Sequence, residues 1–172
     1  SLTVSTSTLA FDSTYVDTLR AAVYNASNTA IQYYSNVIVH TTVLAKPPIW
    51  EVNPFEFQHS MNMVVQLDMD TDPYEEELSE DEFDKVAVFN NGQIRGVANI
   101  ERVFTQSGWK YLAYLDVYSY NAFGDSLSFR LWDADKGKQY GSEEDGTIIF
   151  ADNGIVGSNL TPKKIHAKGL VQ

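Results

Sequence analysis

The chain contains no cysteine among its 172 residues and only three histidines. The absence of cysteine excludes disulfide bonds, thiol catalysis and cysteine-ligated metal sites. The histidines, His40, His59 and His166, are isolated in sequence and match no zinc-binding spacing. Because histidine is also the commonest general base, the sequence offers few of the residues on which acid–base, thiol or zinc chemistry depends.

Basic residues are scarce as well. There are 12 Lys and Arg residues against 23 Asp and Glu residues, which gives a formal net charge of −11. Such a charge repels phosphate backbones and anionic lipid surfaces, so we predict neither nucleic acid nor a membrane as a partner. The chain also has no run of about 18 apolar residues, the length that a bilayer-spanning helix requires.

Helical periodicity is missing too, and the pattern that replaces it is typical of strands. Residues 84–98 contain two short apolar runs around the turn Asn90-Asn91-Gly92, which favours a β-hairpin. Alternating or β-branched runs recur along the chain. They predict further strands over residues 2–11, 18–24, 36–44, 61–67, 109–120, 127–131 and 147–150. We therefore expect an all-β protein, an antiparallel β-sandwich of immunoglobulin-like or jelly-roll-like type with about eight to ten strands.

The segment Lys46-Pro47-Pro48 interrupts the strand pattern, because consecutive prolines cannot donate to a central β-ladder. We place the internal boundary there. Residues 1–45 are expected to hold immunoglobulin-like strands, either as a domain of their own or as part of the same sandwich. Residues 46–172 are expected to form a β-sandwich module.

An acidic stretch covers residues 68–84, with ten carboxylates and one proline. It predicts a long exposed loop, with one helical turn near residues 75–78. Asp68, Asp70 and Asp72 alternate within it, and such spacing can bring several oxygen ligands to one calcium ion. The helix-loop-helix calcium pattern fails, because Pro73 and Ser79 stand where that pattern needs Gly and Glu. A solvated acidic loop and a calcium site therefore both remain open.

Aromatic residues are the remaining lead to function. Residues 109–120 alternate so that Trp109, Tyr111, Ala113, Leu115 and Val117 point to one face of the strand, and Leu112, Tyr114, Tyr118 and Tyr120 to the other. On that second face we predict a carbohydrate-binding surface of aromatic rings and polar neighbours, since such rings stack on the apolar faces of sugars. Its predicted members are Tyr114, Asp116, Tyr118 and Tyr120, with Arg130 and Trp132 from the next strand. The alternative is that these rings are covered by a second sheet or domain.

Gly124-Asp125-Ser126-Leu127 spells the nucleophile block of the GDSL hydrolases. In that family the serine follows the first strand of an α/β/α domain, and a downstream Asp-x-x-His completes the triad. Here the block lies late in the chain, and Lys163 rather than Asp precedes His166 by three residues. We interpret the block as an entry into a strand, predict no catalytic residue, and expect neither esterase nor glycosidase activity.

A set of motifs between residues 50 and 162 resembles an uncharacterised β-sandwich module of large secreted multidomain bacterial proteins. The module's pattern is a Trp, an Asn-Pro pair with a following aromatic, Ser-Met, an acidic loop and a hairpin of the form D-x-V-A-x-F followed by G-x-x-R-G-V-A. The matching residues are Trp50, Asn53-Pro54, Phe57, Ser60-Met61, Asp84, Val86-Ala87, Phe89, Gly92 and Arg95-Gly96-Val97-Ala98. The resemblance continues through residues 124–133 and 157–162.

Two residues depart from the module's pattern: Val88 replaces an Ala, and Trp132 stands where the module has Tyr. Residues 1–45 resemble part of an immunoglobulin-like partner domain. The resemblance implies a non-catalytic, secreted or cell-surface part of a larger protein, and it supplies no ligand.

Two functions follow as hypotheses. The first is a non-catalytic module that binds a polysaccharide or surface glycan through exposed aromatics, with calcium as its one candidate cofactor. The second is a structural or adhesive module, such as a spacer or filament subunit, that contacts neighbouring domains of a larger protein.

Overall fold

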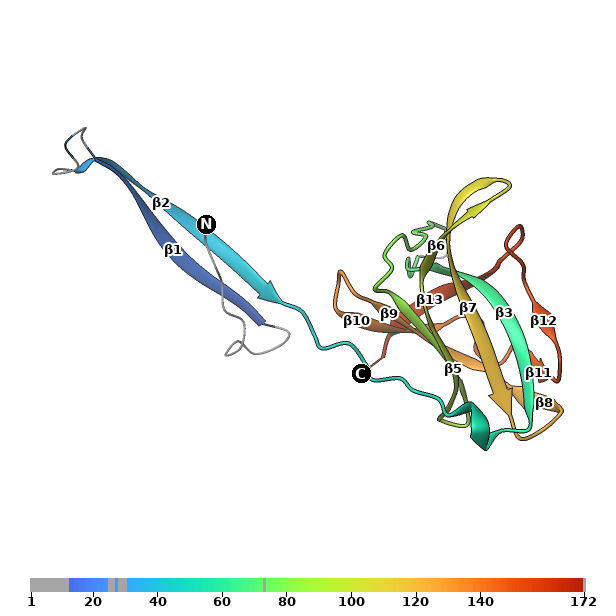
Figure 1. Cartoon of the computed structure of the whole chain (residues 1–172). Coiled ribbons are helices and arrows are strands. Elements are labelled where there is room, and N and C mark those ends of the chain that lie inside the picture. Colours follow the sequence, from blue (N-terminus) through green and yellow to red (C-terminus); the bar gives the residue numbers. More distant parts are fainter. Residues whose placement is uncertain (1–12, 25–26, 28–30, 73, 172) are drawn as a thin grey trace. The chain divides into compact units, whose positions relative to one another are not determined.

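The computed structural model describes residues 13–24, 27, 31–72 and 74–171 (Figure 1). These residues form thirteen β-strands and one short 3-10 helix, and they contain no α-helix, which confirms the all-β prediction. There are more strands than expected because several are too short to show alternation, such as β12 (Ile155–Val156). The described part of the chain has no helix long and apolar enough to cross a membrane.

The chain divides into two compact units, Ser1–Lys46 and Pro47–Gln172, and the division falls within the Lys46-Pro47-Pro48 segment. In the first unit, β1 (Ser13–Tyr24) and β2 (Ile31–Val43) form a long antiparallel hairpin with Ser13 opposite Val43. The predicted strands 18–24 and 36–44 fall on this hairpin. The predicted strand 2–11 lies outside the described residues.

The second unit is built on one mixed sheet of nine strands. Its order is β5-β4-β9-β10-β13-β3-β7-β6, and β12 pairs beside β13 on the same edge of β3. Both of those pairings with β3 are parallel, and the other ladders are antiparallel. A separate two-stranded sheet joins β8 to β11. The elements after β2 are η1 (Pro54–Glu56), β3 (His59–Asp68), β4 (Lys85–Asn90), β5 (Gln93–Asn99), β6 (Glu101–Thr105), β7 (Gly108–Ser119), β8 (Phe123–Ser126), β9 (Ser128–Asp133), β10 (Lys138–Ser142), β11 (Ile149–Ala151), β12 (Ile155–Val156) and β13 (Lys163–Leu170).

The core lies between strands that face one another across the curled sheet. The predicted inward face of β3 is confirmed, because alternate residues of this strand are buried. They pack in one apolar cluster with inward residues of β4, β7, β9 and β13. Burial of these side chains is the main force that holds the sheet in its curled form. The central members are Met61, Met63, Val65, Leu67, Val86, Val88, Leu115, Val117, Phe129, Leu131 and Ile165.

The sheet curls so far that its edge strand β5 returns against β7. A Cβ atom placed on Gly96 would lie 2.6 Å from the carbonyl oxygen of Asp116, so only glycine permits this approach. The predicted hairpin 84–98 is β4 and β5, and its turn places Asn91 and Gly92 at positive φ. Two further residues of the sequence motif also touch: Trp50 contacts the ring of Phe89 on β4 edge-on, with 6.4 Å between centroids.

The acidic stretch 68–84 differs from the expected free loop. Asp68 and Leu78 form a β-bridge, and the backbone N–H of Ser79 donates to the carbonyl of Leu67. Within the stretch, Met69 and Asp84 are buried. The predicted helical turn at residues 75–78 is wrong, because this segment runs extended beside the end of β3 instead.

Candidate functional site

The tyrosines of the predicted carbohydrate surface lie on one outer face of β7. Tyr114 and Asp116 are exposed there, and Tyr118 is half-buried. The hydroxyl of Tyr114 donates to Asn159 Oδ1 at 3.0 Å. Asn62 of the neighbouring strand β3 donates from Nδ2 to Asp116 Oδ1 at 2.5 Å. The face is therefore polar and already ordered by hydrogen bonds.

The rings of Tyr118 and Tyr120 are largely occupied by other side chains. Phe57 stacks on Tyr118 with 6.0 Å between centroids and lies 4.7 Å from Tyr120. The guanidinium of Arg95 sits 4.8 Å from the Tyr120 ring and 5.0 Å from the Phe57 ring. These contacts attach the segment around Phe57 to β5 and β7, so both tyrosines stabilise the fold in addition to any contact with a ligand.

Arg95 is nearly enclosed by this cluster. It is 5% exposed, its Nη2 donates to Asn90 Oδ1 at 3.4 Å, and its Nε and Nη1 have no partner. The positive charge of Arg95 also acts on Asp125. Burial would raise the pKa of Asp125, but hydrogen bonds from Ser119 and Asn121 and the charge of Arg95 together lower it.

Arg130 and Trp132 do not join the tyrosines. Both lie on β9, which is separated from β7 in the sheet by β10, β13 and β3. Trp132 is 4% exposed, so the prediction that its ring is available for stacking on a sugar is wrong. Arg130 donates from Nη1 to Asp145 Oδ2 at 3.3 Å and lies over the ring of Phe89.

The most exposed aromatic pair instead lies on the hairpin of β6 and β7. Phe104 and Trp109 are directly opposite in register, with centroids 5.2 Å apart and exposed fractions of 69% and 58%. The guanidinium of Arg102 lies 4.4 Å from the centre of the Trp109 ring. A hollow of about 370 Å³ opens beside this pair, and we call it the rim site. It is lined by Gln66, Leu78, Ser79, Glu80, Arg102, Trp109, Lys110 and Tyr111.

Trp109 lies on the face of β7 that the alternation predicts, together with Tyr111, which packs against the core. The strand continues beyond the core, however, so its first residues face solvent. Phe104 pairs with Trp109 in the sheet, but the exposure of both rings follows only from the structure and not from the sequence.

The predicted calcium ligands lie at a second, acidic hollow of about 230 Å³. Their carboxylates cap successive backbone turns: Asp68 accepts from the N–H of Asp70, Asp70 from Asp72, and Asp72 from Tyr74. These local bonds explain the alternate spacing by themselves. Among the described residues no three His, Asp or Glu side chains converge as a metal site would require. Calcium binding by these residues stays a prediction.

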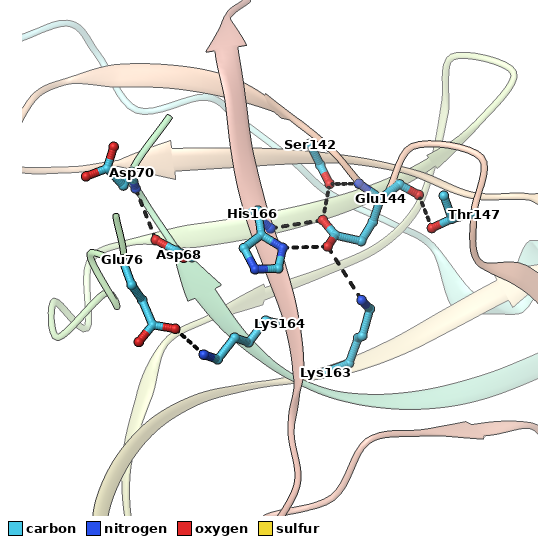
Figure 2. Close-up of polar contacts among 9 residues, drawn as sticks. All are labelled: Asp68, Asp70, Glu76, Ser142, Glu144, Thr147, Lys163, Lys164 and His166. Atoms are coloured by element: carbon cyan, nitrogen blue, oxygen red, sulfur yellow. Dashed lines mark hydrogen bonds and ion pairs between the residues drawn. The ribbon is translucent and has the colours of Figure 1, made fainter. Parts of the chain in front are cut away.

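A buried Glu144 borders the same region, and Figure 2 shows it beside His166 of β13. Its Oε1 accepts from His166 Nδ1 at 2.7 Å, and its Oε2 accepts from the His166 backbone N–H and from Ser142 Oγ, each at 2.9 Å. Lys163 Nζ lies 3.5 Å from Oε1. Burial would raise the pKa of Glu144, but these hydrogen bonds outweigh burial and hold the pKa below its ordinary value.

This Glu144–His166 pair orients the imidazole beside the acidic hollow, which His166 helps to line. Glu76, which also lines that hollow, forms an ion pair with Lys164 (Figure 2). In the described part of the chain, the hydrogen bonds of the His166 ring include no hydroxyl that could serve as a nucleophile. The hydrogen bonds of the pair link β13 to the loop after β10.

The Gly124-Asp125-Ser126-Leu127 block lies on β8 and its junction with β9. Asp125 accepts hydrogen bonds from Ser119 and from Asn121 Nδ2. The backbone carbonyl of Ser126 accepts a hydrogen bond from Asn90 Nδ2 at 2.9 Å. His59 pairs with Asp152 and His166 with Glu144. The block's polar groups thus hold the turn that enters the strand.

Comparisons of the chain with models of protein families, with curated proteins and with solved structures found no match.

Proposed function

We propose that this protein is a non-catalytic, secreted or cell-surface β-sandwich module that binds a polysaccharide or surface glycan. The observation that supports the proposal is the rim site, where an exposed tryptophan ring borders a hollow lined by polar side chains. A sugar ring has an apolar face that stacks on an aromatic ring and hydroxyls that need hydrogen-bond partners at its edge. The rim site offers both kinds of contact together.

Trp109 is the anchor of the proposed site. Arg102 covers one face of the indole, yet 58% of the residue remains exposed, which leaves ring surface for a ligand. Phe104 meets it at an interplanar angle of 64° and extends the apolar surface. Because Arg102 and Phe104 fix the ring, stacking a sugar on it costs little additional conformational entropy.

Polar groups around the hollow supply the contacts to hydroxyls. Gln66 and Glu80 offer amide and carboxylate groups, and Lys110 is held in place by donating from Nζ to the carbonyl of Leu160 at 3.0 Å. At about 370 Å³ the hollow is near the lower end of the usual size of ligand sites, so the module would recognise a chain end or a short stretch of polymer. The resemblance to secreted bacterial modules gives the proposal its cellular setting.

Replacing Trp109 by alanine is expected to weaken polysaccharide binding by about tenfold or more, because a central aromatic anchor commonly supplies much of a site's affinity. Binding is measured by depletion from solution onto insoluble polysaccharides and on a glycan array, with and without calcium. The matched control is Tyr74→Ala, which removes an aromatic ring that is 95% exposed and lies outside the rim site.

Equal binding by wild type and Trp109→Ala would place the site elsewhere. In that case Tyr114→Ala, on the outer face of β7, tests the tyrosine surface that the sequence predicts. Loss of binding in Tyr74→Ala as well would point to non-specific adsorption of exposed aromatics.

A structural or adhesive role is the second candidate function. The observation that favours it is the hairpin β1–β2, on which Val16, Val37 and Ile38 are all at least half exposed. A two-stranded hairpin is at best marginally stable alone in water and gains stability when further strands or a packed layer join it. Such a surface fits contact with neighbouring protein domains.

A further inference from the structure

The hairpin β1–β2 has two outer edges, and they differ in how well they are protected from pairing. In the described part of the chain, β2 pairs with β1 and with no other strand. Natural proteins guard such edges with charged residues, prolines or bulges. β1 carries Asp17 and Arg20, whereas the 13 residues of β2, IQYYSNVIVHTTV, include no Asp, Glu, Lys, Arg or Pro.

The composition of β2 also favours pairing directly. β2 is rich in β-branched residues, and Val37 and Ile38 expose apolar surface on its two faces. Such residues pack well against a neighbouring strand on both faces of a sheet. A strand of this length without charged residues is a template for the addition of another strand.

Charge distribution indicates what kind of strand β2 would accept. Residues 1–46 hold two acidic and two basic residues, Asp12, Asp17, Arg20 and Lys46, so this unit has no net charge. The whole net charge of −11 therefore belongs to residues 47–172. An uncharged strand has no electrostatic preference for a basic or acidic partner and suits an equally uncharged copy of itself. Antiparallel pairing of a strand with its own copy also closes around a two-fold axis, which limits assembly to a dimer.

We propose that two copies of this chain associate by antiparallel pairing of β2 with β2 of the second copy. The product is a four-stranded sheet in the order β1-β2-β2-β1, in which both apolar hairpins gain the strands that they lack alone. The inference rests on the second candidate function and names its partner, and it does not depend on carbohydrate binding by the rim site.

The acidic second units repel each other when two copies meet. Salt screens this repulsion: at physiological ionic strength it is largely lost beyond about 8 Å, and at higher salt concentrations this distance is shorter. Association through the neutral hairpins therefore strengthens with salt, whereas association through opposite charges would weaken.

The test is sedimentation equilibrium of the full chain at concentrations up to about 100 µM, in about 50 mM and 500 mM NaCl. Wild type is expected to dimerise, more tightly in the higher salt. Ile38→Lys brings two lysines into the pairing strands, where like charges repel, and is expected to weaken the dimer by about tenfold or more.

Val16→Lys is the matched control. Val16 and Ile38 are each 62% exposed and lie on the same face of the hairpin, but Val16 is on β1, away from the proposed junction. It is expected to change dimerisation less than about threefold. A wild type that stays monomeric in both salts overturns the proposal, and so does a Val16→Lys effect as large as that of Ile38→Lys, which would indicate packing of faces rather than pairing of edges. Polysaccharide depletion on the same samples reports separately on the rim site.

Discussion

Replacing Gly157 by alanine is expected to destabilise the second unit by about 3 kcal/mol or more. Gly157 has a φ of +75°, and a Cβ atom there would lie 2.3 Å from the carbonyl oxygen of Val64 and 2.8 Å from the N of Lys163. Both neighbours are backbone atoms of paired strands, so neither can move aside cheaply. The residue lies where the chain leaves β12 and loops out before β13 rejoins the same edge of β3.

Gly92→Ala separates the two causes of that loss. Gly92 has nearly the same φ, +79°, but a Cβ atom there meets nothing within 4 Å. The backbone conformation alone is expected to cost about 1 kcal/mol. Urea unfolding followed by tryptophan fluorescence measures both variants. Equal losses would show that the close approach of Gly157 to β3 is not what the glycine is needed for.

Replacing Glu144 by glutamine is expected to cost about 3 kcal/mol of unfolding free energy at neutral pH, because it breaks a buried charged cluster. The amide keeps one acceptor oxygen and presents an NH₂ group to donors that the carboxylate satisfied. His166, Ser142 and Lys163 all lose part of their hydrogen bonding.

The same substitution is expected to flatten the acid limb of the stability profile. The folded-state pKa of Glu144 lies below its ordinary value of 4.5, so the ionised form contributes stability above that value. That contribution is lost as the pH falls through the folded-state pKa. Urea unfolding at a series of pH values should therefore show the wild-type and Glu144→Gln curves converging toward acid pH.

The exposed neighbour Glu143 supplies the control. Glu143→Gln removes the same charge from the same loop and is expected to change stability by less than about 0.5 kcal/mol at every pH. A Glu144→Gln curve that stays parallel to wild type down to acid pH would contradict the role given to the carboxylate.

Much of the fold was predictable because it depends on local patterns. Alternation along residues 61–67 predicted the buried face of β3, and Asn91 and Gly92 predicted the turn between β4 and β5. The parallel pairing of β3 with β12 and β13 was not predictable, since it joins segments about 100 residues apart. A single sequence without an alignment carries no record of such contacts.

The candidate site was predictable only in part, for a related reason. Period-two alternation assigns a residue to a face, but it does not say how far the core extends along that face. Trp109 shares a face with core residues of β7 and lies beyond the core, whereas Trp132, which alternation places away from the apolar face of β9, is buried. Exposure of a ring depends on what packs over it, and that is a property of the assembled sheet.

The measurement that tests the central claim most directly is binding of the wild-type chain to a broad panel of insoluble polysaccharides and arrayed glycans, with and without calcium. The account predicts saturable binding to at least one glycan, and the same soluble oligosaccharide should protect an exposed tryptophan from acrylamide quenching. Of the three tryptophans, Trp109 is the most exposed, so that protection would report on the rim site. If the chain shows no saturable binding to any glycan, either with or without calcium, the result would contradict the account.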